Sequence, residues 1–455
     1  MPEHLTQDTL PKRTKRTRKK PAETAIAFVD KLNYDGSGVA RVNGKVTFIE
    51  GALPGERVLF GYEKHRKSYD AGRTIEIITA SPDRVLKPPC PYFGTCGGCA
   101  LQHFQSDAQI SAKEQVLRES LEHIGKIRPE NWVAPLRGPA WGYRRKARLG
   151  VRHVPKKGGI LVGFREHKRS FITPLADCKI LDPRFARLLP ILPGLIAQLS
   201  RPNRIPQIEV AAGDHEAALV FRHLDPLTPQ DHERLRRFGQ DHTVQIHLQP
   251  GGPESVHPLW PEQPPSLAYR LPEHDVEIQF TPTDFAQVNA DVNRAMVGRA
   301  LDWLDPQPNE RILDLFCGVG NFTLPLARRS LSVVALEWDA ALLERARANV
   351  ARNSITNVEF RRVDLNAEAS RAPWDDNRFD KLLLDPPRSG AIEAIKRVPA
   401  DGPQRIVYVS CYPATLARDS DYLVHALGYR LMRACVMDMF PHTAHAESMA
   451  LFVRE

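Results

Sequence analysis

The sequence has no uninterrupted apolar run long enough to cross a lipid bilayer, and we therefore expect no membrane partner. Its first residues, Met1 to His4, do not begin a secretory signal. Cysteine is scarce as well, because the 455 residues include only 7, an odd number that is spread unevenly along the chain. This distribution argues against a disulfide framework, and we expect a cytoplasmic protein.

An excess of acidic residues is also missing. The chain has 63 Lys and Arg against 54 Asp and Glu, a formal net charge of +9, which favours an anionic partner and nucleic acid first. Residues 12 to 20 carry 7 positive charges in 9 positions. We expect residues 1–22 to form a disordered basic tail that contacts RNA; the alternative is a solvated tail with no such role.

Residues 23–81 alternate short apolar runs with turn signals at Tyr34–Gly38 and Asn43–Gly44. About five short strands in so few residues predict a small OB-like β-barrel. The segments Gly36–Arg41 and Gly51–Arg57 resemble the TRAM domain, an RNA-binding barrel of RNA-modifying enzymes. The resemblance implies that this region binds RNA.

The next segment, residues 82–279, is β-rich and opens with the array Cys90-x5-Cys96-x2-Cys99. Three cysteines at this density predict a soft-ligand site, for which Cys178 is the best fourth ligand. The spacing alone leaves zinc and an iron–sulfur cluster open. Dense basic segments, residues 143–148 and 165–169, have aromatic neighbours and suit a folded RNA, although such runs are more often solvated faces.

From residue 280 to 455, strands and helices alternate, which predicts a doubly wound, Rossmann-like α/β domain. The apolar strand Arg311–Leu315 leads into a turn with Gly318 and Gly320, and Thr323 replaces the third glycine of a dinucleotide fingerprint. Acidic residues follow the successive strands. The ordered series resembles the fold of S-adenosylmethionine-dependent methyltransferases, and its acids are Asp314, Glu337, Asp364 and Asp385.

A cysteine stands where the strand Ile406–Val409 gives way to a loop. The thiolate of Cys411 would be a strong nucleophile at the functional edge of the sheet, although a lone cysteine is more often a small core residue. Its surroundings decide between the two. Four motifs together resemble the RNA 5-methyluridine methyltransferases, and they are Phe285–Asn289, Asp385–Arg388, Ser410–Asp419 and His445–Glu447.

The family resemblance implies a reaction and its residues. Cys411 would add to C6 of a uridine, so that C5 becomes electron-rich enough to take the methyl group of S-adenosylmethionine, and Glu447 would then accept the C5 proton. In that family the cysteine array (Cys90, Cys96, Cys99 and Cys178) holds a [4Fe–4S] cluster. By the same resemblance, the cofactor site would be formed by Gln287, Phe316, Asn321, Glu337, Asp364 and Asp385, with the division of roles between Gln287 and Asp385 left open.

The combination of a barrel and a cysteine array points to the branch of the family that methylates one uridine of 23S ribosomal RNA. The family also implies that the helix within Gln102–Pro129 packs on the catalytic domain, and no obligate protein partner is implied, so we expect a monomer. One alternative is the same chemistry on tRNA or on another 23S rRNA site. The other is a non-catalytic RNA-binding iron–sulfur protein, which would have no reason to hold both Cys411 and Glu447.

Overall fold

The computed structural model describes residues 23–367, 378–399 and 401–454, and the expected basic tail lies outside these residues. The described residues divide into two compact units, residues 23–33 with 37–82 and residues 34–36 with the described residues from 83 onward. The second unit contains both of the segments that we expect to be the central and catalytic domains. None of the described helices has the length and apolar character that a membrane span requires.

The first unit is a six-stranded sheet in the order β1-β5-β6-β4-β3-β2, in which β4 and β6 are parallel and the other neighbours antiparallel. Val29, Ile49 and Phe60 are fully buried in its core. The buried carboxylate of Glu56 accepts hydrogen bonds from the backbone N–H groups of Leu53 (2.8 Å) and Ser81 (3.3 Å), which ties the last residues of the unit to its body. The strands are β1 (Thr24–Phe28), β2 (Lys31–Leu32), β3 (Gly38–Val42), β4 (Lys45–Glu50), β5 (Arg57–His65) and β6 (Tyr69–Thr79).

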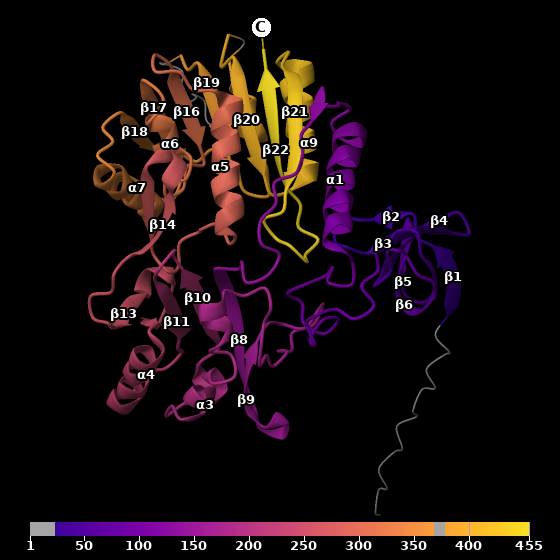
Figure 1. Cartoon of the computed structure of the whole chain (residues 1–455), viewed down its shortest axis with the longest axis vertical. Coiled ribbons are helices and arrows are strands. Elements are labelled where there is room, and N and C mark those ends of the chain that lie inside the picture. The colour runs from indigo at the N-terminus through magenta and orange to yellow at the C-terminus, as the bar shows by residue number, and fades with distance from the viewer. Residues whose placement is uncertain (1–22, 368–377, 400, 455) are drawn as a thin grey trace, which may run out of the picture. The chain divides into compact units, whose positions relative to one another are not determined.

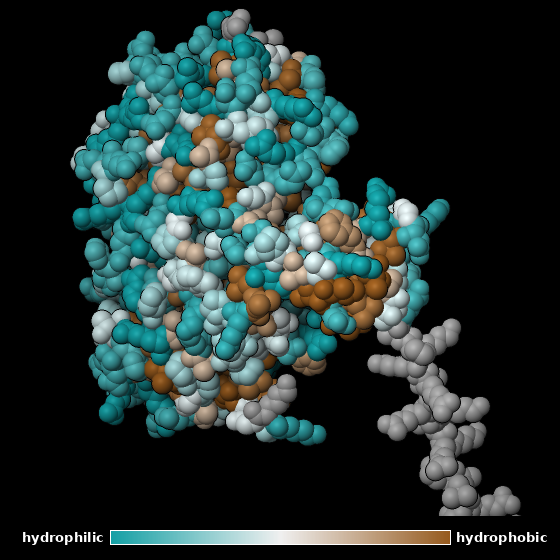
Figure 2. Space-filling view, turned by 45° about the vertical axis from the view of Figure 1, so that its right-hand side comes forward, coloured by the Kyte–Doolittle hydropathy of each residue, from teal (hydrophilic) through white to brown (hydrophobic). Residues whose placement is uncertain are grey.

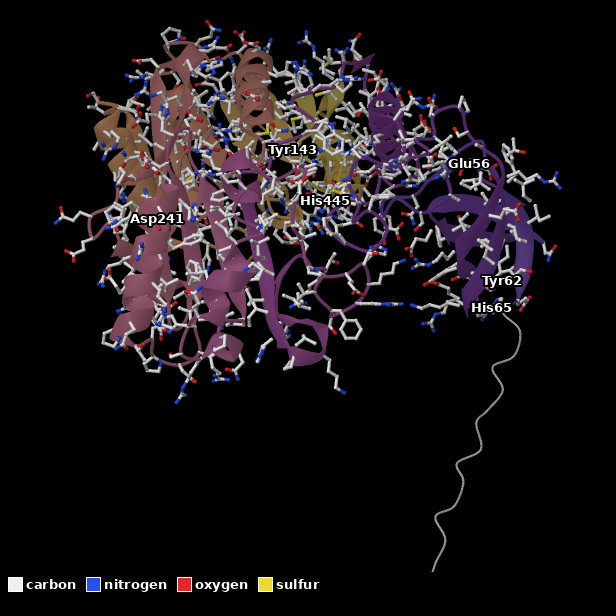
Figure 3. All side chains as sticks on the ribbon, turned by 60° about the horizontal axis from the view of Figure 1, so that its bottom comes forward. Glu56, Tyr62, His65, Tyr143, Asp241 and His445 are labelled. Atoms are coloured by element: carbon white, nitrogen blue, oxygen red, sulfur yellow. The ribbon has the colours of Figure 1, made fainter. Side chains whose placement is uncertain are left out.

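The surface of this barrel carries both aromatic and apolar groups. The rings of Tyr62 and His65 lie 4.7 Å apart (centroid to centroid) at one end of the barrel (Figure 3). Ile26 and Phe28 on β1 are exposed, as is Ile75 on β6, and Figure 2 shows hydrophobic surface on the barrel. A ring pair beside exposed basic side chains is suited to contact with nucleic acid bases and phosphates.

The central part of the second unit is built on a six-stranded sheet in the order β13-β12-β11-β10-β8-β9 (Figure 1). Its helix α4 begins with a capping box, in which Thr228 and Asp231 each accept a hydrogen bond from the other's backbone. The strands are β8 (Lys146–Val154), β9 (Gly159–Gly163), β10 (Gln207–Ala212), β11 (Ala217–Arg222), β12 (Gln245–Gln249) and β13 (His257–Trp260), followed by the hairpin β14 (Leu267–Leu271) and β15 (Val276–Phe280). The helices are α2 (Pro183–Ala186), α3 (Leu192–Ala197) and α4 (Pro229–His242), with 3-10 turns η1 (Pro155–Lys157), η2 (Pro202–Arg204), η3 (Pro253–Ser255) and η4 (Pro272–His274).

The catalytic part carries an eight-stranded sheet in the order β18-β17-β16-β19-β20-β22-β21-β7. Strands β16 to β20 run parallel, whereas β22 is antiparallel to both of its neighbours. The central strands are almost continuously apolar, because a parallel sheet is covered on both faces. The strands are β7 (Asn131–Trp132), β16 (Arg311–Leu315), β17 (Ser332–Glu337), β18 (Val358–Arg362), β19 (Lys381–Leu384), β20 (Arg405–Ser410), β21 (Arg430–Met437) and β22 (Glu447–Val453). The helices are α5 (Ala290–Leu304), α6 (Thr323–Ala327), α7 (Ala340–Arg352), α8 (Ile392–Ile395) and α9 (Pro413–Asp421), with the π-helical turn η5 (Tyr422–Ala426).

Helix α1 (Ser106–His123) precedes the central sheet in sequence but packs beside α9 and β21 (Figure 1). Leu117 and Leu121 of α1 are fully buried in the same core as Tyr408 of β20. The following strand, β7, extends the large sheet by pairing with β21. The segment after the cysteine array, from α1 to β7, is therefore part of the core built on the eight-stranded sheet.

Candidate active site and cysteine cavity

The register of two strands brings the expected nucleophile and proton acceptor together. Strands β20 and β22 are antiparallel neighbours, and Ser410 at the end of β20 pairs with Ser448 near the start of β22. The next residues outward are Cys411 and Glu447, which therefore meet at the same edge of the sheet. This edge is the one at which the parallel strands end, where α/β proteins place their binding sites.

Cys411 opens into a cavity of about 1050 Å³, which we call the basic cavity. Its walls come from the catalytic part, with Tyr412, Phe440 and His445, and from the central part, whose β8 and neighbouring loops face the thiol. The cationic side chains that line it are Arg144, Arg148, Arg152, Arg165, Lys168 and Arg388. A half-buried thiol that lines a cationic cavity is accessible to a polyanionic substrate.

Burial sets the protonation of the reactive groups. It raises the pKa of the Cys411 thiol to about 11, and the nearby carboxylates of Glu447 and Asp385 act in the same direction. Burial also raises the pKa of Glu447 to about 7, against the opposing charges of Arg388 and Lys113. The pKa of Asp385 rises to about 8 through burial and the proximity of Glu447. The thiol is therefore protonated at neutral pH, while Glu447 is poised to gain or lose a proton there.

Arg388 and His445 form one wall of the basic cavity. The guanidinium of Arg388 donates to Nδ1 of His445 (3.0 Å), and the ring of His445 lies 5.1 Å from that of Phe440. Burial and the charge of Arg388 lower the pKa of His445 to about 4, so that the imidazole is neutral and can accept this hydrogen bond. Tyr143, from the central part, reaches the same loop by donating to the carbonyl of Pro441 (3.0 Å); Figure 3 labels Tyr143 and His445.

The glycine turn after β16 lies beside two acids. Phe316, Gly318 and Gly320 all have positive φ (65°, 54° and 100°), which bends the backbone sharply after the strand. Glu337, at the end of β17, accepts from the N–H of Gly318 (3.2 Å) through one oxygen and from the N–H groups that follow it through the other. A carboxylate has about four lone-pair sites, so Glu337 keeps acceptor capacity for a ligand.

Asp314 lies beneath this turn and is almost inaccessible to solvent. One of its oxygens accepts from the hydroxyl of Thr323 (2.5 Å), and the other has no hydrogen-bond partner in the structure. Burial raises its pKa to about 7, and the charges of Asp385 and Glu337 add to the effect. The sequence series of acids included Asp314, but its position gave no sign that its carboxyl group would be buried and half-satisfied.

The remaining expected cofactor residues lie around the same edge in different settings. The amide of Asn321 exchanges two hydrogen bonds of 3.0 Å with Asn293 and accepts from the hydroxyl of Tyr269 (2.9 Å), so it is held by protein groups. Asp364 follows β18 and accepts from the N–H of Asn366 (3.0 Å). Gln287 is half-buried in the loop between β15 and α5. The roles assigned to these residues remain predictions.

The four cysteines of the expected cluster line one small cavity of about 20 Å³. Backbone N–H groups face the sulfurs: Gly98 donates to Sγ of Cys96 (3.4 Å), and Leu181 and Ile180 to Cys178. Burial raises the pKa of Cys96 to about 11 and that of Cys99 to about 12, so a nearby cation would be needed to hold them as thiolates. These features fit a thiolate-bound metal group. Within the described ranges, however, no three or more Cys, His, Asp or Glu side chains are grouped closely enough to hold a metal ion, so the cluster remains a prediction.

Comparison with known proteins defines the family. A family model described as tRNA (Uracil-5-)-methyltransferase matches residues 268–455, and the TRAM domain model matches residues 20–59. The crystal structure of Pyrococcus abyssi tRNA (uracil-54, C5)-methyltransferase in complex with S-adenosyl-L-homocysteine has a TM-score of 0.72 at 24% identity and covers 94% of this chain and 100% of its own. At that identity it shows the fold alone. The predicted α/β methyltransferase fold and TRAM domain are thereby confirmed.

Relatives with higher identity extend over nearly the whole chain. A protein of Alkalilimnicola ehrlichii named 23S rRNA (uracil(1939)-C(5))-methyltransferase RlmD is 51% identical over 441 residues, which are 97% of this chain and 99% of the relative. A protein of the same name from Alcanivorax borkumensis is 50% identical and covers 96% of this chain and 98% of its own. The chain therefore belongs to the RNA uracil-C5 methyltransferase family, in the group whose members are named 23S rRNA (uracil(1939)-C(5))-methyltransferase RlmD.

Proposed function

We propose that this protein methylates C5 of one uridine in 23S rRNA, at the position named for its relatives, uridine 1939. The observation that supports the proposal is the register of β20 and β22, which brings Glu447 next to Cys411, a residue that lines the basic cavity. A nucleophile and a proton acceptor are the two groups that C5 methylation needs from the protein.

In the proposed reaction the proton of the Cys411 thiol passes to solvent, and the thiolate bonds to C6 of the uracil. The C5–C6 π bond breaks as this bond forms, which gives an enolate with its electron density on C5 and the C4 carbonyl oxygen. S-adenosylmethionine, when bound, supplies an electrophilic methyl group, which C5 takes. Glu447 then accepts the proton from C5, and the electron pair left behind expels the Cys411 sulfur from C6. To reach a thiol inside a cavity, the uracil base must unstack from its neighbouring bases, so we propose that it is flipped out of the RNA.

The cofactor is proposed to lie along the carboxyl ends of β16 to β19. In this assignment Glu337 accepts hydrogen bonds from the ribose hydroxyls and Asp364 lies near the adenine amino group, whereas Asp385 and Gln287 hold the cofactor or the base edge. Phe316 and Asn321 belong to the glycine turn that follows β16 and would contact the cofactor from there. The positive φ values of the turn and the free acceptor capacity of Glu337 support the assignment.

A [4Fe–4S] cluster on Cys90, Cys96, Cys99 and Cys178 is the second part of the proposal. The shared cavity and the N–H groups that face the sulfurs support it. Measuring iron, acid-labile sulfide and zinc in anaerobically purified protein tests it. Four irons and four sulfides per chain are expected, with loss of both in Cys99→Ser. Stoichiometric zinc without sulfide would contradict the cluster.

We further propose that residues 23–81 bind RNA, that residues 82–279 and 280–455 act as the central and catalytic domains, and that the protein works as a monomer. The experiment that tests the function is nucleotide-resolution mapping of methyluridine after incubation with radiolabelled S-adenosylmethionine and either unmodified 23S rRNA or tRNA. A single site in 23S rRNA is expected with the wild type and none with Cys411→Ala. Label confined to tRNA would contradict the proposed substrate.

A further inference from the structure

Helix α1 buries two polar side chains on the face that it turns toward the active site. Gln109 is 1% exposed and Lys113, one turn later, is 3% exposed. Burial of an amide and an ammonium group costs free energy unless each finds partners, and an apolar residue would fill the same space more cheaply. The contacts of these two side chains therefore identify what the helix face does.

Gln109 binds the loop that precedes β22, residues 438–446, which we call the base loop. Its Oε1 accepts from the N–H of His442 (2.9 Å), and its Nε2 donates to the carbonyls of Leu101 (2.9 Å) and Phe104 (2.8 Å). His442 has a φ of 63°, in the left-handed region that residues with a side chain adopt rarely. The carbonyl of His442 accepts in turn from the N–H groups of Ala100 and Leu101, which follow the cysteine array.

Lys113 binds the same loop one turn of helix away. Its ammonium group donates to Oδ1 of Asp438 (2.7 Å) and to the carbonyl of Phe440 (3.0 Å). Asp438 directly follows β21, and Met437 at the end of β21 pairs with Glu447 at the start of β22. Gln109 and Lys113 thus fix the base loop at its first residue and at its centre.

We infer that Gln109 and Lys113 are positioning residues, which hold the base loop so that the carboxylate of Glu447 stays aimed at the substrate position. The inference rests on the proposed role of Glu447 and goes beyond it, because it assigns a task in the reaction to a helix that lies outside the α/β domain in sequence.

Lys113 also contributes charge to the surroundings of Glu447. The groups that face this carboxylate are Lys113 from α1, Arg388 after β19, Asp385 at the end of β19 and Cys411 at the end of β20. Within the base loop His445 is neutral because its pKa is about 4. Lys113 and Arg388 both favour the ionised carboxylate, the form that accepts a proton.

The test is the pH dependence of the decay of the Cys411–RNA adduct, followed in single-turnover reactions of the full-length protein with unmodified 23S rRNA. In Lys113→Met the missing positive charge raises the pKa of Glu447. The acidic limb of the pH–rate profile, where the rate of adduct decay falls with decreasing pH, therefore moves to higher pH. Below the limb, adduct decay slows by about tenfold, the factor that corresponds to one pKa unit. Formation of the adduct keeps the wild-type rate, and Lys113→Arg, which retains the charge, keeps the wild-type profile.

Two further variants complete the test. Gln115→Met lies on the exposed face of the same helix and should leave the profile unchanged. If Lys113→Met fails to fold because Asp438 is left unpaired, Lys113→Gln removes the charge but keeps a hydrogen-bond donor for Asp438, and it is expected to shift the limb in the same direction. An unchanged limb in either folded variant would overturn the inference. A wild type that forms no adduct would overturn the proposed function instead.

Discussion

Cys411, the proposed nucleophile, lies in surroundings that disfavour its thiolate form. Burial and two neighbouring carboxylates raise the pKa of the thiol to about 11, well above that of a free cysteine. A thiol that is mostly protonated reacts slowly with electrophiles, because the thiolate is the nucleophile. A bound cationic sulfonium and the loss of a carboxylate charge would both lower its pKa, so activation is coupled to the arrival of the reactants.

Glu447→Gln should trap the covalent adduct. The amide is nearly the same shape but cannot take the C5 proton, so the electron pair that expels the sulfur is never released. A denaturant-resistant species of reduced gel mobility should accumulate with radiolabelled 23S rRNA. The double variant Cys411→Ala/Glu447→Gln is the matched control and should give no such band. A single variant that still turns over rapidly would contradict the role of Glu447.

Methyl transfer should rise with pH across neutrality. The pKa of Glu447 is about 7, and this carboxyl must be ionised to accept a proton, so the rate falls as the pH drops below that value. The pKa of Cys411 is about 11, so the thiolate fraction also grows with pH throughout this range. Initial rates between about pH 6 and pH 9 at constant ionic strength check the sign. A rate that falls with increasing pH over this interval would contradict it.

At the scale of elements, the site depends on packing between segments that are distant in sequence. Asp419 in α9 is fully buried and accepts from the hydroxyl of Tyr408 (2.7 Å), the N–H of Ala391 (2.7 Å) and the guanidinium of Arg418. These bonds join α9 to β20 and to the turn after the Asp385-Pro-Pro-Arg388 segment. One polar network therefore joins α9, β20 and the turn after β19, which are the segments that lead to Cys411 and Asp385.

Removing the side chain of Leu117 should destabilise the packing of α1 on the catalytic sheet. Leu117 is completely buried among residues of α9 and β20, and a Leu→Ala change at such a site costs about 2–5 kcal/mol. Chemical denaturation should show this loss in the free energy of unfolding. Gln115→Ala on the exposed face of α1 is the control and should change stability by no more than about 0.5 kcal/mol.

The sequence predicted which strands, turns and helices form the site, but it did not predict which of their residues contact one another. Alternating apolar strands and helices, the glycine turn and the acids at strand ends are local signals, and they were sufficient for the α/β fold. The pairing of Ser410 with Ser448 is a long-range register, which no local pattern contains. Lys113 is similar: in sequence it is one more charged residue of an amphipathic helix, and only the packing of α1 shows that it is buried against Asp438.

At the scale of the whole molecule, several cationic side chains line the cavity into which Cys411 opens. The central part supplies most of the cations of the basic cavity, and the catalytic part supplies the thiol. Arg148 is already paired with Glu209 (2.7 Å), so its charge is partly offset, whereas Arg152 and Arg165 are exposed side chains on the same wall. Phosphates of a bound RNA would displace condensed counterions as they meet these groups.

Neutralising Arg152 and Arg165 together should weaken RNA binding in a salt-dependent way. Each phosphate contact that is lost removes a released counterion, so the slope of log K against log salt should become shallower by about 0.7 to 0.9 per contact. Binding of a 23S rRNA fragment to Arg152→Ala/Arg165→Ala, titrated at several salt concentrations, measures this slope. Arg236→Ala/Arg237→Ala is the control, because it removes the same number of positive charges from α4, and neither residue lines the cavity. Equal loss of affinity in both variants would mean that the net charge of the protein attracts the RNA, whereas a change confined to the cavity variant would place the RNA backbone across the mouth of the site that holds Cys411.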